Sequence, residues 1–350
     1  MKIKNLKLIV AMSVLLVSSV FARELASSEV NSRASERVLN GENLSPGISV
    51  LNINNIAYWI GKDGAYTTAG SPNGTMADYP IFTGGFIYSD GMLWGAKVKG
   101  DGQGDEVRVG GSTYNHGLKA GRIITDANGD VIGSDDPVNN HVWRVRKDWA
   151  SADLTVDAAN YYAVGTGDVS AAQIAVVKNQ YEYDWYNWPA AWGAPYHDVN
   201  GDGNYDPAVD VPGYPGADQT MWTIANDVPL IVNADGDSIG YQSTAPNLYG
   251  ADPIGIELQI TLWGYAFGAS DPLGNNIFKQ AKMKYMGLPG TPDGAMLDSL
   301  YFTQWSDPDL GTYTDDYVGC DIDLSFGYVY NGNRLDGVFN GIFNLPVPAG

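Results

Sequence analysis

The sequence predicts an all-β chain, folded as one or more antiparallel β-sandwiches with long Gly- and Asp-rich loops and at most one or two short helices. From Ile48 onward, short apolar runs alternate with clusters of Gly, Asn, Asp and Pro, which form turns. Several of these runs alternate strictly between apolar and polar residues. After residue 50 the only glutamates are Glu106, Glu182 and Glu257, and the abundant Asp favours turns where Glu would favour helices.

The clearest predicted strand covers residues 254–263. Its even-numbered positions are Ile or Leu up to Leu262, and the positions between them are Gly, Glu, Gln and Thr. Residues 280–285 and 322–328 repeat the alternation. One face of each strand is therefore expected to be buried and the other to face water, as in an antiparallel sheet.

Two Asp-rich segments are predicted to be hairpin turns. Residues 126–130 (DANGD) and 233–237 (NADGD) each lie between apolar stretches and contain Asn-Gly or Asp-Gly, the favoured two-residue hairpin loops. One helix is predicted after Ser170, because Ser170 and Gln173 can form a capping box. This helix is expected to end before Tyr183.

The N-terminal residues predict export. Lys2, Lys4 and Lys7 precede an apolar run, and Val20-Phe21-Ala22 suits a signal-peptidase site. Residues 1–22 are therefore predicted to be a signal peptide cleaved after Ala22. No later segment is apolar enough for a transmembrane helix.

The remaining chain divides into a short lead and one long region. Residues 23–47 are polar and lack an apolar period, so they are expected to be a flexible lead. Residues 48–350 are expected to be a β-rich extracellular region, either undivided or split into two sub-domains near residues 180–215. A formal net charge of −20 makes nucleic acid an improbable partner, since phosphates require a basic surface. The single cysteine, Cys320, is expected to be a small buried residue.

The segment 198–206 (DVNGDGNYD) has the spacing of a calcium-binding loop. Calcium takes hard oxygen ligands, which a short loop supplies from alternate positions around a glycine at position 6. Gly203 occupies that position, and the closing ligand at position 12 is displaced by one residue to Asp210. The predicted calcium ligands are Asp198, Asn200, Asp202, Asn204, Asp206 and Asp210.

Prolines after the loop make an exiting helix improbable. The loop therefore resembles the calcium loops of dockerins and thrombospondin type 3 repeats, and lacks the helix pair of a regulatory EF-hand. The resemblance implies that Ca²⁺ would stabilise structure more than switch it. The alternative is a solvated Asp/Asn/Gly turn without metal.

A second acidic cluster precedes the C-terminus. Like charges at this density need water, cations or hydrogen bonds to compensate them, so a second calcium site is one interpretation. An exposed acidic loop is another, and a paired-carboxylate glycoside hydrolase is a third. The cluster consists of Asp307, Asp309, Asp315, Asp316 and Asp321.

Three tryptophans, Trp185, Trp188 and Trp192, lie directly before the calcium loop among several tyrosines. Aromatic faces stack on sugar rings, so these residues are candidates for glycan binding. Core packing is the favoured alternative, because Trp and Tyr bury large areas.

Several stretches together resemble large secreted β-rich surface proteins of Bacteroidota-like bacteria, which a type IX secretion system often carries to the cell surface. The stretches are 91–100 (GMLWGAKVKG), 187–189 (NWP), 193–196 (GAPY), 253–257 (PIGIE), 305–311 (WSDPDLG) and 315–321 (DDYVGCD). The resemblance covers residues 51–333 and implies an extracellular β-rich architecture, but no established activity and no catalytic residues. Members usually continue into further β domains and a sorting signal, so this chain is expected to be truncated after Gly350.

The sequence thus predicts a secreted, calcium-binding, non-catalytic protein of structural or adhesion type at the cell surface. Its expected partners are cell-surface or matrix components, glycans among them. Two alternatives remain open, a calcium-dependent glycan-binding module and a carboxylate-dependent glycoside hydrolase.

Overall fold

The computed structural model describes residues 47–64, 74–134, 141–233, 235, 237–241, 248 and 251–333. The predicted signal peptide, residues 23–46 of the predicted lead and the C-terminal residues 334–350 lie outside the described residues. The chain is mostly β, with 40% strand and 15% helix. The sequence predicts an all-β fold. The structure is not clearly all-β, because two helices form a layer of their own.

The first sheet is antiparallel and has the order β1-β2-β3-β4-β17, with β5 also paired to β4. The long strand β4 organises this sheet, because β17 pairs along nearly its whole length while β3 and β5 pair with its two halves. The strands are β1 (Ile48–Leu51), β2 (Ala57–Gly61), β3 (Ala77–Asp78), β4 (Gly85–Lys99), β5 (Glu106–Gly111) and β17 (Met296–Pro308).

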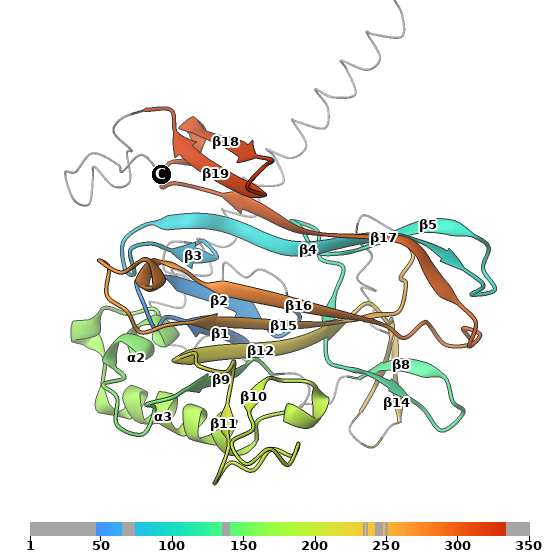
Figure 1. Cartoon of the computed structure of the whole chain (residues 1–350), viewed down its shortest axis with the longest axis horizontal. Helices are drawn as coiled ribbons and strands as arrows, with labels where there is room; N and C mark the ends of the chain where they lie inside the picture. Colours follow the sequence, from blue (N-terminus) through green and yellow to red (C-terminus); the bar gives the residue numbers. More distant parts are fainter. Residues whose placement is uncertain are drawn as a thin grey trace, which may run out of the picture.

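The second sheet is also antiparallel, with the order β16-β15-β12-β6, and β9 pairs with β12. Its strands are β6 (Lys119–Ala120), β9 (Trp143–Arg146), β12 (Gln219–Asn226), β15 (Ile256–Gly264) and β16 (Phe278–Tyr285). Figure 1 shows the two sheets stacked on one another, with the helices on the far side of the second sheet.

Three smaller sheets make up the rest of the β-structure in the described part of the chain. The order β14-β13-β8-β7 contains the one parallel pair among the described strands, β13 with β8. The others are the pairs β10-β11 and β18-β19. The strands are β7 (Ile123–Thr125), β8 (Val131–Ser134), β10 (Tyr196–His197), β11 (Val211–Pro212), β13 (Leu230–Val232), β14 (Ser238–Tyr241), β18 (Asp316–Asp321) and β19 (Phe326–Asn331).

Both predicted hairpin turns are confirmed. Residues 126–130 join the antiparallel strands β7 and β8, and the Asp126 carboxylate accepts hydrogen bonds from the backbone N–H groups of Asn128 and Asp130. Of the second segment the structure describes residues 233, 235 and 237, which lie between the antiparallel strands β13 and β14. Asn233 Oδ1 accepts from the backbone N–H groups of Asp235 and Asp237. In both turns a short side chain satisfies the backbone locally, which is why the sequence alone identifies them.

The α-helices of the described residues are α2 (Thr155–Tyr162) and α3 (Ala171–Tyr186). The predicted capping box at Ser170 is confirmed, since Ser170 Oγ accepts from the Gln173 N–H and the Gln173 side chain bonds back to the Ser170 N–H. The helix does not end before Tyr183 but runs through Trp185 to Tyr186. Short 3₁₀ segments are η1 (Thr166–Asp168), η2 (Ala190–Trp192), η4 (Pro272–Asn275) and η5 (Tyr313–Asp315).

The central strand β12 of the second sheet is buried on both faces, whereas the edge strand β16 exposes Gln280, Lys282 and Lys284. Along β12, Met221 and Ala225 belong to the core between the two sheets, whereas Trp222 and Ile224 pack with Trp188 on the opposite face. Such a strand carries apolar residues on both sides, as strands covered on both faces do.

The predicted alternation of β15 is therefore only half right. Its apolar positions face the core between the sheets, but the positions expected to face water are covered as well. Glu257 is buried and its carboxylate accepts from the Ile123 N–H, while Gln259 Nε2 donates to the Trp192 carbonyl at 3.0 Å. The segments that carry Ile123 and Trp192 cover this face. Both are far from β15 in the chain, so the alternation within β15 could not predict that they cover it.

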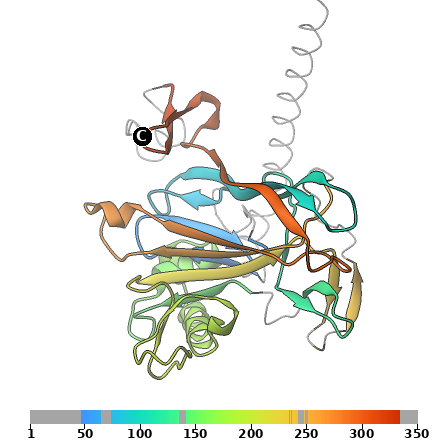
Figure 2. The same ribbon diagram turned by 45° about the vertical axis from the view of Figure 1, so that its right-hand side comes forward.

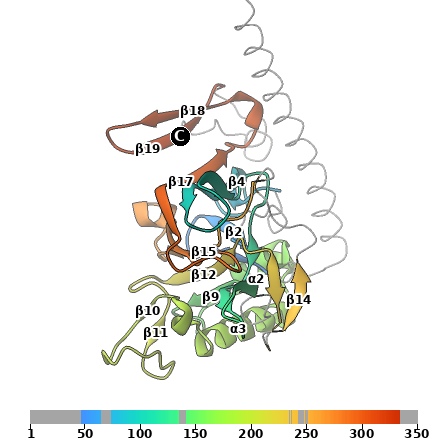
Figure 3. The ribbon, with the colours of Figure 1, turned by 90° about the vertical axis from the view of Figure 1, so that its right-hand side faces the viewer.

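The predicted strand 322–328 is wrong over residues 322–325, which form a turn, while residues 326–328 belong to β19. The chain turns between β18 and β19, with Ser325 in the left-handed region at φ 51°, and Ile322 and Leu324 are 85% and 74% exposed. Cys320 is exposed rather than buried. Figures 2 and 3 show this hairpin on the side of the first sheet that faces away from the second sheet.

Candidate functional site

The predicted calcium loop is an excursion between β10 and β11. These strands pair at its base, with Tyr196 opposite Pro212 and His197 opposite Val211. In Figure 1 the loop extends beyond the helical layer at the end of the molecule farthest from β18 and β19. Both ends of the loop are thus fixed in one small antiparallel pair.

Asp210 closes the loop from within. Its side chain is 2% exposed, and its two carboxylate oxygens accept from the backbone N–H groups of Val199 at 2.9 Å and Asp206 at 2.8 Å. A buried carboxylate needs such partners, because burial without them would favour its neutral form. Asp210 therefore ties the two ends of the acidic segment together, at the place where the sequence predicts the closing ligand.

The alternating Asp and Asn side chains turn back onto the loop backbone. Asp198 accepts from the N–H groups of Gly201 and Gly203, at 2.7 and 2.8 Å. Asn200 accepts from the Asp202 N–H at 3.1 Å. Both glycines have positive φ, 74° and 78°, which lets the chain curl around these side chains.

Asp202 lies at the tip of this curl. Its carboxylate accepts from the Asn204 N–H at 2.7 Å and from the Asn200 amide at 3.0 Å. The backbone bond and, after it, the amide bond hold the pKa of Asp202 below its usual range, so this carboxylate remains ionised at neutral pH. An ionised carboxylate has about four lone-pair positions, so the loop keeps oxygen acceptors beyond those that its own N–H groups use.

Within the described parts of the chain, no group of three or more His, Cys, Asp or Glu side chains is arranged to hold a metal ion. This finding covers the whole loop, so its four carboxylates (Asp198, Asp202, Asp206 and Asp210) do not converge on one point in this structure. Calcium binding by the loop stays a prediction.

The second acidic cluster is not brought together at one point. Asp316 and Asp321 lie at opposite ends of β18, a strand of 6 residues, which separates their backbones by about 16 Å. Asp316 accepts from the Leu310 N–H and Asp321 from the Leu324 N–H, so each serves its own turn. One ion cannot use all five predicted residues.

The other acids of this cluster also have partners. The Tyr114 hydroxyl donates to Asp307 at 2.5 Å, and Asp315 accepts from the Asn333 N–H at 3.1 Å. Asp309 is buried. Each of these acids bonds to a different group near a loop or a strand end. This arrangement favours an exposed acidic loop over a second calcium site.

The three tryptophans differ in exposure. Trp188 is 4% exposed, packs with Trp143 and Trp222, and donates from Nε1 to the Pro195 carbonyl at 2.8 Å. Its role is core packing, so it offers no face to a sugar.

Trp185 and Trp192 are half-buried. Trp185 Nε1 lies 3.4 Å from the Pro207 carbonyl, and the Tyr205 hydroxyl donates to the Trp185 carbonyl, so this residue supports the acidic loop. The Arg122 guanidinium lies 4.3 Å from the centre of the Trp192 ring and covers one of its faces.

A buried ionic network that the sequence analysis missed joins the helices to the second sheet. Asp157 on α2 accepts from Arg144 at 2.5 Å and Arg146 at 2.7 Å, and the Tyr181 hydroxyl of α3 donates to it at 2.5 Å. Asp157, Arg144 and Tyr181 are each no more than 4% exposed. Burial and the Asp157 charge raise the pKa of Tyr181 well above its usual value, despite the opposing influence of Arg144, so Tyr181 remains a donor.

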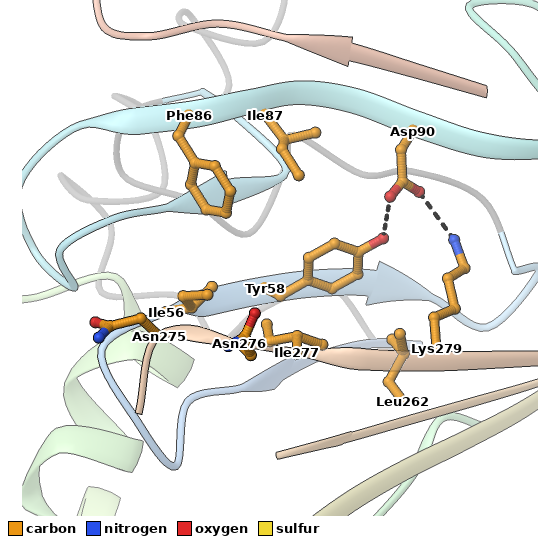
Figure 4. Close-up of a pocket in the computed structure, with 10 residues that line it drawn as sticks. All are labelled: Ile56, Tyr58, Phe86, Ile87, Asp90, Leu262, Asn275, Asn276, Ile277 and Lys279. Carbon is orange, nitrogen blue, oxygen red and sulfur yellow. Dashed lines mark hydrogen bonds and ion pairs between the residues drawn. The ribbon is translucent and has the colours of Figure 1, made fainter. Parts of the chain in front are cut away.

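A cavity of about 290 Å³ lies between the first sheet and β16. Tyr58, Asp90 and Lys279 meet at one end of it (Figure 4). No local sequence signal marks these residues, because β2, β4 and β16 are far apart in the chain.

Comparison with protein-family models, with curated proteins and with solved structures finds no match for this chain. The helices of the described segments are all too short or too polar to cross a membrane.

Proposed function

We propose that the protein is exported and acts as a calcium-binding structural or adhesion-type component of the cell surface, without a catalytic role. The observation that carries this proposal is the 198–210 loop, whose Asp and Asn side chains alternate around two left-handed glycines and whose ends are clamped by Asp210. Calcium prefers such sets of carboxylate and amide oxygens.

Electrostatics support the calcium assignment. The loop carries four of the acidic residues of a chain of net charge −20, and a surface of net negative charge attracts cations. A divalent cation would offset part of this charge. Because β10 and β11 hold both ends of the loop, we expect Ca²⁺ to stiffen the loop without opening or closing another part of the protein.

The adhesion part of the proposal rests on exposed apolar side chains far from the loop. Four large apolar side chains of the β18–β19 hairpin, Val318, Ile322, Leu324 and Phe326, are 71%, 85%, 74% and 57% exposed. Large apolar side chains gathered on a surface favour contact with other macromolecules. We expect cell-surface or matrix components as partners.

Thermal unfolding tests the calcium proposal. At a calcium concentration a hundredfold above Kd, native-state binding should stabilise the protein by about 2.7 kcal/mol relative to the protein in chelator. Asp202→Ala should abolish most of this increase. Asp126→Ala is the matched control, because Asp126 makes similar turn bonds but belongs to an ordinary hairpin.

An increase of equal size in all three proteins would assign the effect to calcium elsewhere in the molecule. No increase in the wild-type protein would reduce the loop to a solvated turn and contradict the proposal.

Calcium binding should also depend on pH in a defined direction. The folded-state pKa of Asp202 is lowered, so its contribution to the loop is present above the unfolded-state value of about 3.9 and is lost as the pH falls through the folded-state value. We expect a nearly constant calcium affinity from pH 8 to 5 and a steep loss below about pH 4, since the ligands must be deprotonated. Titrations followed by Trp and Tyr fluorescence at three pH values measure this, and a loss centred near pH 6.5 would instead implicate a histidine.

A further inference from the structure

The cavity between the first sheet and β16 is lined mostly by apolar side chains, with Asp90 and Lys279 at one end and the amides of Asn275 and Asn276 elsewhere in its wall. Figure 4 shows Phe86, Ile87 and Asp90 projecting into it from β4, opposite the segment that carries Asn275, Asn276, Ile277 and Lys279. Tyr58 and Ile56 line it from the β2 side, and Leu262 from β15. The space thus lies between two sheets that are separate hydrogen-bonded units.

The body of the cavity is small and mostly apolar. Leu262 is 1% exposed and Ile56 is 6% exposed, so this part of the lining is fixed in the core between the sheets. An apolar cavity of roughly 150 Å³ is known to take up benzene. A volume of about 290 Å³ therefore suits one aromatic ring with a substituent, or a short branched alkyl group.

The polar end is a hydrogen-bonded trio. The Tyr58 hydroxyl donates to Asp90 Oδ2 at 2.6 Å, and Lys279 Nζ donates to Asp90 Oδ1 at 3.1 Å. Burial, followed by the Asp90 charge and its hydrogen bond, raises the pKa of Tyr58 well above its usual value, so this hydroxyl stays protonated. Both carboxylate oxygens thus have a donor.

Lys279 keeps hydrogen-bonding capacity. An ammonium group has three N–H donors, and Asp90 takes one of them. The Lys279 side chain is 17% exposed, at the rim of the cavity rather than deep in it. Its other N–H groups can reach water or an acceptor atom that enters the cavity.

We propose that this cavity binds a small neutral molecule with an apolar body and a single oxygen acceptor, a hydroxyl or carbonyl, that receives a hydrogen bond from Lys279. Pockets of this kind combine an apolar lining with few polar groups that fix orientation.

The charges and lining restrict the ligand class further. The ion pair of Asp90 with Lys279 is neutral overall, so a carboxylate ligand would add an unpaired charge in a partly desolvated space. A sugar would bring several hydroxyl groups against Ile56, Ile87 and Leu262, which cannot bond them. The side-chain amide groups of Asn275 and Asn276 in the wall already donate to backbone carbonyls. The site is therefore distinct from the glycan and calcium hypotheses.

Binding of three matched probes to the purified protein tests the proposal. Benzyl alcohol has the ring and the acceptor, toluene lacks the acceptor, and benzoate carries a charge. Titration by ¹H–¹⁵N NMR should show benzyl alcohol binding about tenfold more tightly than either of the others, as expected for one hydrogen bond from a charged donor.

Three variants locate the binding. Ile277→Phe places a larger side chain at the cavity wall and should abolish binding of benzyl alcohol and toluene alike. Lys279→Met removes the donor but keeps the apolar stem, so benzyl alcohol should weaken to the affinity of toluene. Lys282→Met, an exposed position on the same strand, should bind all probes as the wild-type protein does.

Circular dichroism and thermal unfolding of each variant establish that it is folded. Failure of benzyl alcohol to bind the wild-type protein would overturn the proposal. Unchanged binding in Ile277→Phe would place the probe elsewhere, and equal affinities for toluene and benzyl alcohol would remove the role of Lys279.

Discussion

Replacing Asp157 by alanine is expected to lower the free energy of unfolding by about 3–5 kcal/mol. The change leaves the Arg144 guanidinium, 4% exposed, without its carboxylate, and it also removes the acceptor of the Tyr181 hydroxyl. An unpaired buried charge costs far more than the pair contributes, which is why the effect is large. Urea unfolding measures it as a lower midpoint at unchanged slope.

Asp148→Ala is the matched control, because Asp148 also pairs with Arg146 but its side chain is 55% exposed. We expect a loss of no more than about 1 kcal/mol there. If Asp157→Ala does not fold, Asp157→Asn keeps one acceptor oxygen and allows the comparison. Equal losses for Asp157 and Asp148 would contradict the assignment of the network as the connection between the helices and the second sheet.

Trp188→Ala is expected to lower the free energy of unfolding by about 3–5 kcal/mol, the usual cost of emptying a large buried aromatic site. Trp188 packs in one cluster with Trp143 and Trp222, and its Nε1 bond to Pro195 holds the segment that leads into the acidic loop. The same denaturant titration provides the measurement.

Tyr186→Ala provides the comparison, since Tyr186 is 56% exposed and should change stability by less than about 0.5 kcal/mol. A small effect at Trp188 would contradict its core role and would return it to the candidates for glycan binding. The large expected loss also means that glycan binding is better tested with Trp185 or Trp192.

Local chemistry accounts for the sequence predictions that hold. The capping box at Ser170 and the two hairpin turns each depend on side chains that bond to backbone groups within a few residues. The strand β15 is predicted by its own alternation. Where the sequence predicts wrongly, the cause is a distant segment: Ile123 and Trp192 cover the face of β15 that its pattern assigns to water.

The same distinction applies to the candidate sites. The acidic loop is visible in the sequence because its residues are contiguous. The hydrogen-bonded residues Tyr58, Asp90 and Lys279 of the cavity are not visible in the sequence. Tyr58 lies 32 residues before Asp90, and Lys279 lies 189 residues after Asp90. The acidic residues near the C-terminus are close in sequence but do not form one site. Asp316 and Asp321 lie at opposite ends of an extended strand, which keeps their side chains apart.

Calcium binding by the 198–210 loop is the central claim, and isothermal titration calorimetry tests it most directly. The wild-type protein and Asp126→Ala are expected to bind one Ca²⁺ per chain at this loop, and Asp202→Ala is expected to lose that ion. An absence of calcium binding in the wild-type protein, or full binding retained by Asp202→Ala, would contradict the account.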